Sequence, residues 1–147
     1  MKLDLGHAAA ALGILAATLI PALAQEEQYS LELNAAQTVD SACRLTFVVN
    51  NASAQNIDAS SFEMVTFGEG GGFASMSVFE FGTILAGRIK VVQFDLAGMT
   101  CEGLTRLVVN GAPQCTIAGA ESDFCFAQLA TANLTDVELL PVPAATP

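Results

Sequence analysis

The chain has 147 residues and a formal charge of −10, and 52% of its residues are hydrophobic. It carries 15 acidic residues and only 5 basic ones, which excludes the basic surface that nucleic acid and anionic lipid require. We therefore expect neither nucleic acid nor a membrane surface to be a partner of the folded protein.

The first 24 residues predict a secretory signal peptide. Lys2 gives a weakly positive start, an apolar stretch rich in Ala and Leu follows, and Pro21 breaks it. Ala22 and Ala24 are small residues of the kind that signal peptidase accepts, so the predicted cleavage lies between Ala24 and Gln25. An uncleaved membrane anchor is the alternative, because the apolar stretch approaches the roughly 20 residues of a spanning helix.

We expect residues 1–24 to be removed, residues 25–140 to form one β-sandwich domain and residues 141–147 to form a disordered Pro-rich tail. The negative charge survives cleavage, because the removed segment contains one basic and one acidic residue, Lys2 and Asp4. No second long apolar run follows. The remaining protein is therefore predicted to be soluble, with no membrane segment, and to be periplasmic or secreted.

The segments that begin the domain alternate apolar and polar side chains, which is the period of a half-buried strand. The first predicted strand places Tyr29, Leu31 and Leu33 on one face. The second begins at a cysteine, and its predicted inward side chains are Cys43, Leu45, Phe47 and Val49.

Two further strands are predicted over 60–68 and 73–82, joined by the glycine-rich sequence GEGGG as a hairpin. In the second of these strands, Phe79 and Phe81 are expected on one face and Val78 on the other. Most of the nine Phe side chains are expected in the core.

The chain from Gly87 onward predicts three more strands, one of them with a turn signal, and a weak helical candidate. Segment 87–98 predicts a strand with both faces half-buried, and Asn110-Gly111 is a turn signal in the next. Segment 123–133 is the one weak helical candidate, and the final strand begins near Leu134. About seven short strands predict an all-β fold, an antiparallel immunoglobulin-like β-sandwich, with a small barrel as the alternative.

The four cysteines predict two disulfides, because an even number in an exported domain of this size is typical of a covalent framework. Zinc binding and thioredoxin-like chemistry are disfavoured, since the sequence contains no C-x-x-C pair. Three pairings are possible and the sequence leaves them open. We favour Cys43 with Cys101 and Cys115 with Cys125, because the second pair closes a short loop rich in turn-forming residues.

The strings CRLTFVVNN and SVFEFGTILAGRIKVVQFDLAGMTCEGLTRLVVNG, together with Cys115 and Cys125, resemble a group of small uncharacterised exported proteins of alphaproteobacteria. That resemblance implies an exported immunoglobulin-like domain with similarly placed cysteines, and it implies no activity. The chain departs from the twin-arginine signal of some such relatives, because it has no Arg pair near its start.

Side chains for catalysis are few. The only histidine, His7, lies in the segment predicted to be removed, which disfavours Ser-His-Asp and Cys-His catalysis. A glycosidase-like pair would have to come from scattered carboxylates. The candidates are Glu63, Glu69, Glu80, Asp95 and Glu102.

A weak calcium site is a further alternative, and Glu121 and Asp123 would supply its nearest carboxylates, although the chain has no D-x-D-x-D-G loop. The function predicted from the sequence is a non-catalytic interaction or structural module without a cofactor. Its expected partner is a protein or an envelope component, bound through a sheet face or a sheet edge. A carboxylate-dependent enzyme and a calcium-dependent structural domain remain the alternatives.

Overall fold

The computed structural model describes residues 28–141. The predicted signal peptide, its cleavage site at Ala24 and Gln25, and residues 142–147 of the predicted tail lie outside this range. Pro141 is the last residue of the final strand, one position beyond the expected end of the domain.

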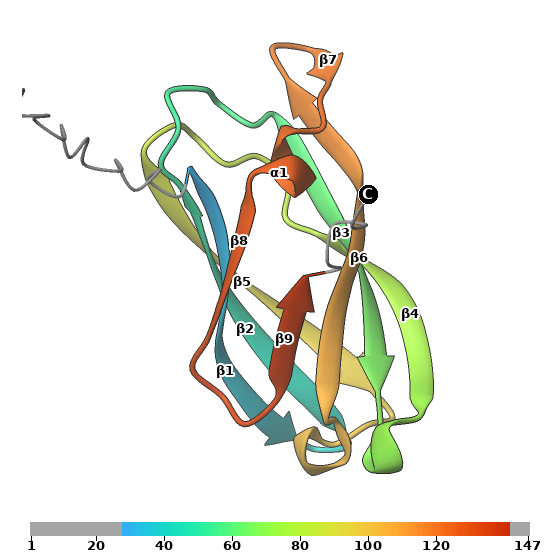
Figure 1. Ribbon diagram of the computed structural model, residues 1–147. Coiled ribbons are helices and arrows are strands. Elements are labelled where there is room, and N and C mark those ends of the chain that lie inside the picture. Colours follow the sequence, from blue (N-terminus) through green and yellow to red (C-terminus); the bar gives the residue numbers. More distant parts are fainter. Residues whose placement is uncertain (1–27, 142–147) are drawn as a thin grey trace, which may run out of the picture.

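The described chain is mostly β-strand and forms two sheets that lie face to face (Figure 1). The first sheet has the order β5-β2-β1-β8. Its strands are β1 (Tyr29–Val39), β2 (Ala42–Asn51), β5 (Arg88–Ala97) and β8 (Leu129–Asn133). The second sheet has the order β4-β3-β6, and both β7 and β9 pair with β6. Its strands are β3 (Ala59–Phe67), β4 (Phe73–Glu80), β6 (Arg106–Ile117), β7 (Ala120–Glu121) and β9 (Glu138–Pro141).

Three short helical turns connect the strands. The turn η1 (Glu69–Gly71) closes the β3–β4 hairpin at the predicted glycine-rich sequence, and η2 (Cys101–Gly103) precedes β6. The one α-helical turn among the described residues, α1 (Phe124–Ala127), falls inside the segment predicted as helical, whereas Leu129–Asn133 of that segment form strand β8. None of the helices in the described range has the length and apolar character needed to cross a bilayer.

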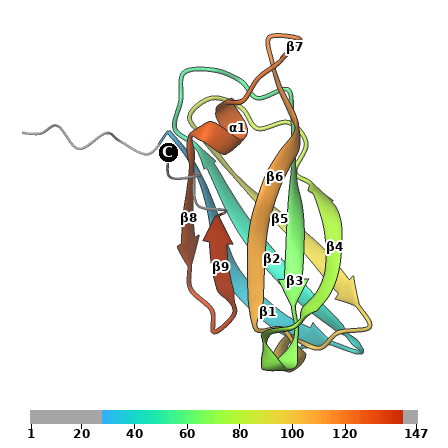
Figure 2. The ribbon, with the colours of Figure 1, turned by 45° about the vertical axis from the view of Figure 1, so that its right-hand side comes forward.

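The prediction of about seven antiparallel strands is corrected in two respects. The described residues form nine strands, and two of the pairings, β1 with β8 and β6 with β9, are parallel. After α1 the chain runs down beside β1, crosses to the second sheet, and returns beside β6 (Figure 2). Side-chain alternation specifies which residues point inward, but it does not specify the direction of a neighbouring strand.

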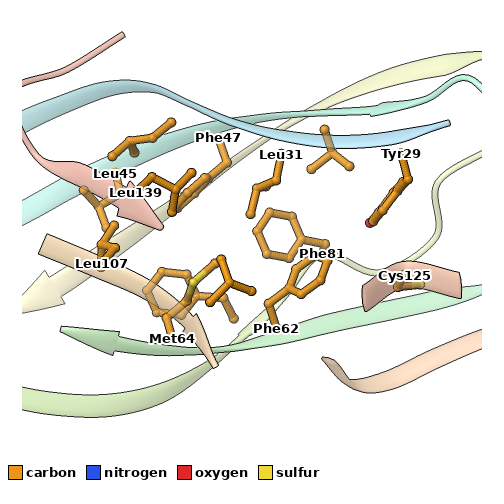
Figure 3. Close-up of a cluster of buried hydrophobic side chains, with 14 of the residues drawn as sticks. Tyr29, Leu31, Leu45, Phe47, Phe62, Met64, Phe81, Leu107, Cys125 and Leu139 are labelled. Carbon is orange, nitrogen blue, oxygen red and sulfur yellow. The ribbon is translucent and has the colours of Figure 1, made fainter. Parts of the chain in front are cut away.

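The core lies between the sheets, and β1 and β2 line one side of it as predicted. The inward side chains of both strands, including Leu31 and Phe47, are fully buried. Phe62 and Met64 of β3 and Leu107 of β6 approach them from the second sheet (Figure 3). A single apolar core of this kind is the main stabilising contribution to a domain of this size.

Two expectations about β5 and β6 are wrong. β5 buries only one face, because Ile89 and Val91 are 66% and 61% exposed, whereas Phe94 packs on the core. Ile89 and Val91 lie on the face of the first sheet that points away from the core, and no described residue buries them. Asn110 and Gly111 form no turn: β6 continues through them, and Gly111 pairs with Glu63 where the register shifts, as in a β-bulge.

Two disulfides connect distant parts of the fold. Cys43 of β2 is bonded to Cys101 of η2, with Cα atoms 4.6 Å apart. Cys115 of β6 is bonded to Cys125 of α1, with Cα atoms 5.8 Å apart. This is the pairing that the loop lengths favour, and two such bonds indicate an oxidising environment outside the cytoplasm.

Candidate interaction surface

The outward face of the second sheet carries a row of aliphatic side chains. Met76 of β4 pairs with Val65 of β3, Val65 pairs with Val108 of β6, and Val108 pairs with Leu140 of β9. Their chain neighbours Met64, Thr66, Leu107, Val109 and Leu139 are buried. Because successive side chains of a strand point to opposite faces, the row points away from the core.

Three more apolar side chains adjoin this row. Val78 follows Met76 on the same face of β4, and Phe67 and Phe73 pair with each other next to the hairpin. Together with the row they form what we call the apolar patch: Val65, Phe67, Phe73, Met76, Val78, Val108 and Leu140. Several of its members are strongly exposed, with 68% for Phe73, 53% for Met76, 49% for Val78 and 43% for Leu140.

An apolar patch that crosses four strands is unusual on the outward face of a sheet. An antiparallel sheet with one solvated face normally presents polar side chains there. The outward face of the first sheet is mixed: Arg44, Thr46 and Asn50 on β2 and Glu32 on β1 are polar, whereas Val48, Ile89 and Val91 form a smaller apolar group beside them. Contiguous exposed apolar side chains that are rimmed by polar ones are typical of interaction sites.

The charged side chains around the apolar patch are mainly acidic. Glu63 accepts a hydrogen bond from the Asn110 amide, with 2.5 Å between Oε1 and Nδ2. Glu80 lies beyond Val78 on β4, and Glu69 lies in the hairpin. We call Glu63, Glu69 and Glu80 the acidic rim. In the described part of the chain, no member of the rim has a salt-bridge partner.

One basic side chain borders the apolar patch, and its charge is already compensated. The Arg106 guanidinium donates from Nε to Glu138 Oε2 at 2.7 Å. The same guanidinium lies over the Phe67 ring, 5.7 Å from the ring centroid, in a cation–π arrangement. Arg106 therefore leaves the acidic character of the rim unchanged.

The side of the sandwich between β4 and β5 is partly open. A groove of about 610 Å³ lies there, lined by side chains that include Phe79 and Phe94. Farther along, the Lys90 ammonium donates to the carbonyl oxygens of Phe81 and Thr83, at 2.5 and 3.1 Å. A charged side chain directed inward from an edge strand is one of the features that oppose unwanted strand pairing.

Two of the candidate catalytic carboxylates, Asp95 and Glu102, have lowered pKa values. The hydrogen bond from Arg44 lowers the pKa of Asp95, with Nε to Oδ1 at 2.7 Å. Hydrogen bonds from its own backbone and from Thr38 lower the pKa of Glu102. A general acid of the glycosidase type needs a raised pKa, so neither group is suited to that role at neutral pH.

Glu102 lines an open cleft of about 770 Å³ at the end of the sandwich where β8 leads into β9. Asp136 and Glu138 also line it, and Glu138 is engaged by Arg106. The cleft therefore combines carboxylate side chains with a partly apolar lining.

The two carboxylates considered for calcium, Glu121 and Asp123, line a third groove of about 510 Å³ beside Cys115. Both side chains are exposed. Within residues 28–141, no three side chains of the kinds that bind metals gather closely enough to hold an ion.

The sequence predicted binding through a sheet face or a sheet edge, but it did not identify the residues that form the apolar patch. The alternation in β3 and β4 identified Phe79 and Phe81 as core residues and Val78 as opposite to them, and both aromatic side chains are buried. The missed signal is that the outward positions of both strands are also apolar, at Val65, Phe67 and Met76. Only the strand register shows that these positions form one row with β6 and β9.

Comparison with known proteins gives no relative: no family model, no curated protein and no solved structure matches the chain. We therefore derive a function from the residues of the surface itself.

Proposed function

We propose that this protein is an exported, non-catalytic interaction module that binds a protein partner through the outward face of its second sheet. The observation that carries the proposal is the apolar patch, in which Val65, Met76, Val108 and Leu140 align across four strands. Burial of such side chains in a complex is favourable, at about 25 cal/mol for each Å² of apolar surface removed from water.

The proposed location is the periplasm or the exterior of the cell. The signal-like sequence of residues 1–24 and the two disulfides support this location, because disulfides persist in oxidising compartments. A kinship with the small exported alphaproteobacterial proteins that the sequence resembles is part of the same proposal.

We also propose that the fold is a variant of the immunoglobulin type. The orders β1-β2-β5 and β4-β3-β6 correspond to strands A-B-E and C′-C-F of that fold. β9 lies beside β6, in the place of strand G, but it runs parallel to β6. The proposal therefore rests on the six strands β1 to β6.

Site-specific photo-crosslinking in the native cell tests the proposed function. A photoreactive residue replaces Met76 in the apolar patch of the full-length chain, and in a control chain it replaces Gln93, which is exposed on the outward face of the first sheet. We expect a discrete adduct with one protein from position 76 and none from position 93. No adduct from position 76, or the same adducts from both positions, would overturn the proposal.

A further inference from the structure

Building on the proposed function, we infer that the apolar patch binds a protein segment whose apolar side chains alternate with lysine or arginine. The inference names the chemistry of the partner, and it follows from two features of the same face. These features are the length of the aliphatic row and the charge of the acidic rim.

The row determines how much of an extended segment makes contact. Its four members, from Met76 to Leu140, lie on four adjacent strands. Neighbouring strands are about 4.8 Å apart, so the row is about 14 Å long. An extended segment advances by about 3.3 Å per residue, so it would place two or three alternate side chains on the row. The intervening side chains point away from the sheet, and the long stems of lysine or arginine allow their charged heads to reach the carboxylates beside the row.

The acidic rim determines the sign of that charge. Glu63 receives a hydrogen bond from the neutral Asn110 amide, and Glu69 and Glu80 are exposed. The nearby cation, Arg106, is paired with Glu138. A basic partner therefore finds carboxylates without a counter-charge beside an apolar row, which is the electrostatic complementarity that accelerates and orients association.

The same charges argue against two other occupants. A second copy of this chain would bring its own acidic rim against this one, and each copy carries a formal charge of −10. Anionic lipid would meet the same carboxylates, whereas lipid surfaces attract basic segments. A basic segment is the occupant for which the apolar and the electrostatic contributions are both favourable.

Synthetic peptides test the inference with the purified full chain. The probes are a nine-residue peptide of alternating valine and lysine, the same peptide with glutamate in place of lysine, and the same peptide with serine in place of valine. Binding is measured by calorimetry, and the site is located from changes in backbone amide NMR signals. We expect the valine–lysine peptide to bind on β4, β3 and β6, the serine–lysine peptide to bind at least about tenfold more weakly, and the glutamate peptide not to bind.

Two double variants with matched controls separate the two contributions. Met76→Ser with Val78→Ser removes exposed apolar side chains from β4, an edge strand of the second sheet. Its control, Ile89→Ser with Val91→Ser, does the same on β5, an edge strand of the first sheet. Glu63→Gln with Glu80→Gln neutralises two carboxylates of the rim. Its control, Glu32→Gln with Glu121→Gln, removes the same charge elsewhere, and Glu32, like Glu63, accepts a hydrogen bond from an asparagine amide.

We expect the variant of the apolar patch and the variant of the acidic rim each to weaken binding of the valine–lysine peptide about tenfold. Each control should leave the affinity within about twofold of the unmodified protein. The effect of the rim variant should disappear at high salt, because exposed charges are screened there. Equal losses in the controls, binding of the glutamate peptide, or no binding of the valine–lysine peptide would overturn the inference. The inference would also be overturned if the protein formed a dimer that the double substitution Met76→Ser with Val78→Ser dissociates. Binding of phosphatidylglycerol vesicles through the apolar patch would overturn it as well.

Failure of the inference and failure of the proposed function give different results. If position 76 crosslinks to one partner whose contacting segment lacks basic residues, the inference is wrong and the interaction function stands. If position 76 gives no adduct, the proposed function itself is wrong.

Discussion

Phe79 of β4 stacks on Phe94 of β5, with ring centroids 4.4 Å apart and an interplanar angle of 25°. The two strands belong to different sheets, so this contact joins the sheets at the side where the groove between β4 and β5 opens. Phe47 of β2 lies edge-on to both rings, at 6.1 Å from each. The stack therefore connects the edge of the sandwich to its centre.

Removal of the Phe79 ring should destabilise the fold strongly. Phe79 is 4% exposed, and Phe79→Ala leaves a cavity against Phe47 and Phe94, so we expect a loss of about 3–5 kcal/mol in the free energy of unfolding. Urea denaturation measures this loss. The matched control is Phe73→Ala on the same strand, where the ring is 68% exposed, and a change below about 0.5 kcal/mol is expected. Equal losses would contradict the assignment of Phe79 to the core.

The two disulfides should contribute unequally to stability. On the chain-entropy model, a loop of 58 residues is worth about 4 kcal/mol and a loop of 10 residues about 3 kcal/mol. Cys43→Ala with Cys101→Ala should therefore lower the urea midpoint more than Cys115→Ala with Cys125→Ala. A thiol reagent should find no free thiol in the folded protein, since all four cysteines are paired. Four reactive thiols in folded protein from the native host would contradict both bonds.

Tyr29 should make the fold sensitive to alkali. Burial raises the pKa of Tyr29 to about 12, and the hydrogen bond with Ser60 opposes this rise only in part. Between pH about 10 and about 12 the unfolded chain has lost this proton and the folded chain keeps it. Stability should therefore fall by roughly 1.4 kcal/mol per pH unit in this window.

The measurement is specific for this residue, because the chain contains one Tyr. The ultraviolet absorbance of tyrosinate should appear near pH 12 in the folded protein and near pH 10 in urea. In the Tyr29→Phe variant, the fall in the free energy of unfolding that this phenol causes between pH about 10 and about 12 should be absent. Titration of the folded protein near pH 10 would show that the phenol is solvated.

The β6–β7 hairpin offers a stabilising substitution. Ala118 and Gly119 at its tip both have positive φ, 51° and 75°, as in a type I′ turn, which favours Asn-Gly. Ala118→Asn should raise stability by about 0.5–1 kcal/mol, because an alanine side chain is strained in this region. Thermal unfolding measures the gain. Ala120→Asn in β7, outside the left-handed region, serves as the control and should give no gain.

Much of the fold was accessible to reasoning from the sequence because one face of each central strand is buried. In β2, Leu45, Phe47 and Val49 alternate with residues that are polar except for Val48, so one register buries far more apolar surface than the other. The β3–β4 hairpin followed from its glycines for a similar local reason. Gly70 and Gly71 have positive φ, which few other residues tolerate.

The remainder depended on pairing between distant strands, which local patterns do not encode. Ile89 and Val91 are as apolar as core residues, but β5 lies at an edge and exposes them. Asn110-Gly111 has the composition of a turn, and the ladder with β3 carries β6 through it. The apolar row was hidden for the same reason, because Leu140 joins Val108 only through a parallel pairing.

The covalent connections also determine what a single protease incision can release. A cut in the β3–β4 hairpin lies between Cys43 and Cys101, so both fragments stay attached through that bond. A cut at Ala118 lies between Cys115 and Cys125 and has the same result. Cleavage at either of these exposed tips would leave one covalent molecule whose sheets remain paired. Cleavage of the backbone there would therefore not by itself inactivate the protein.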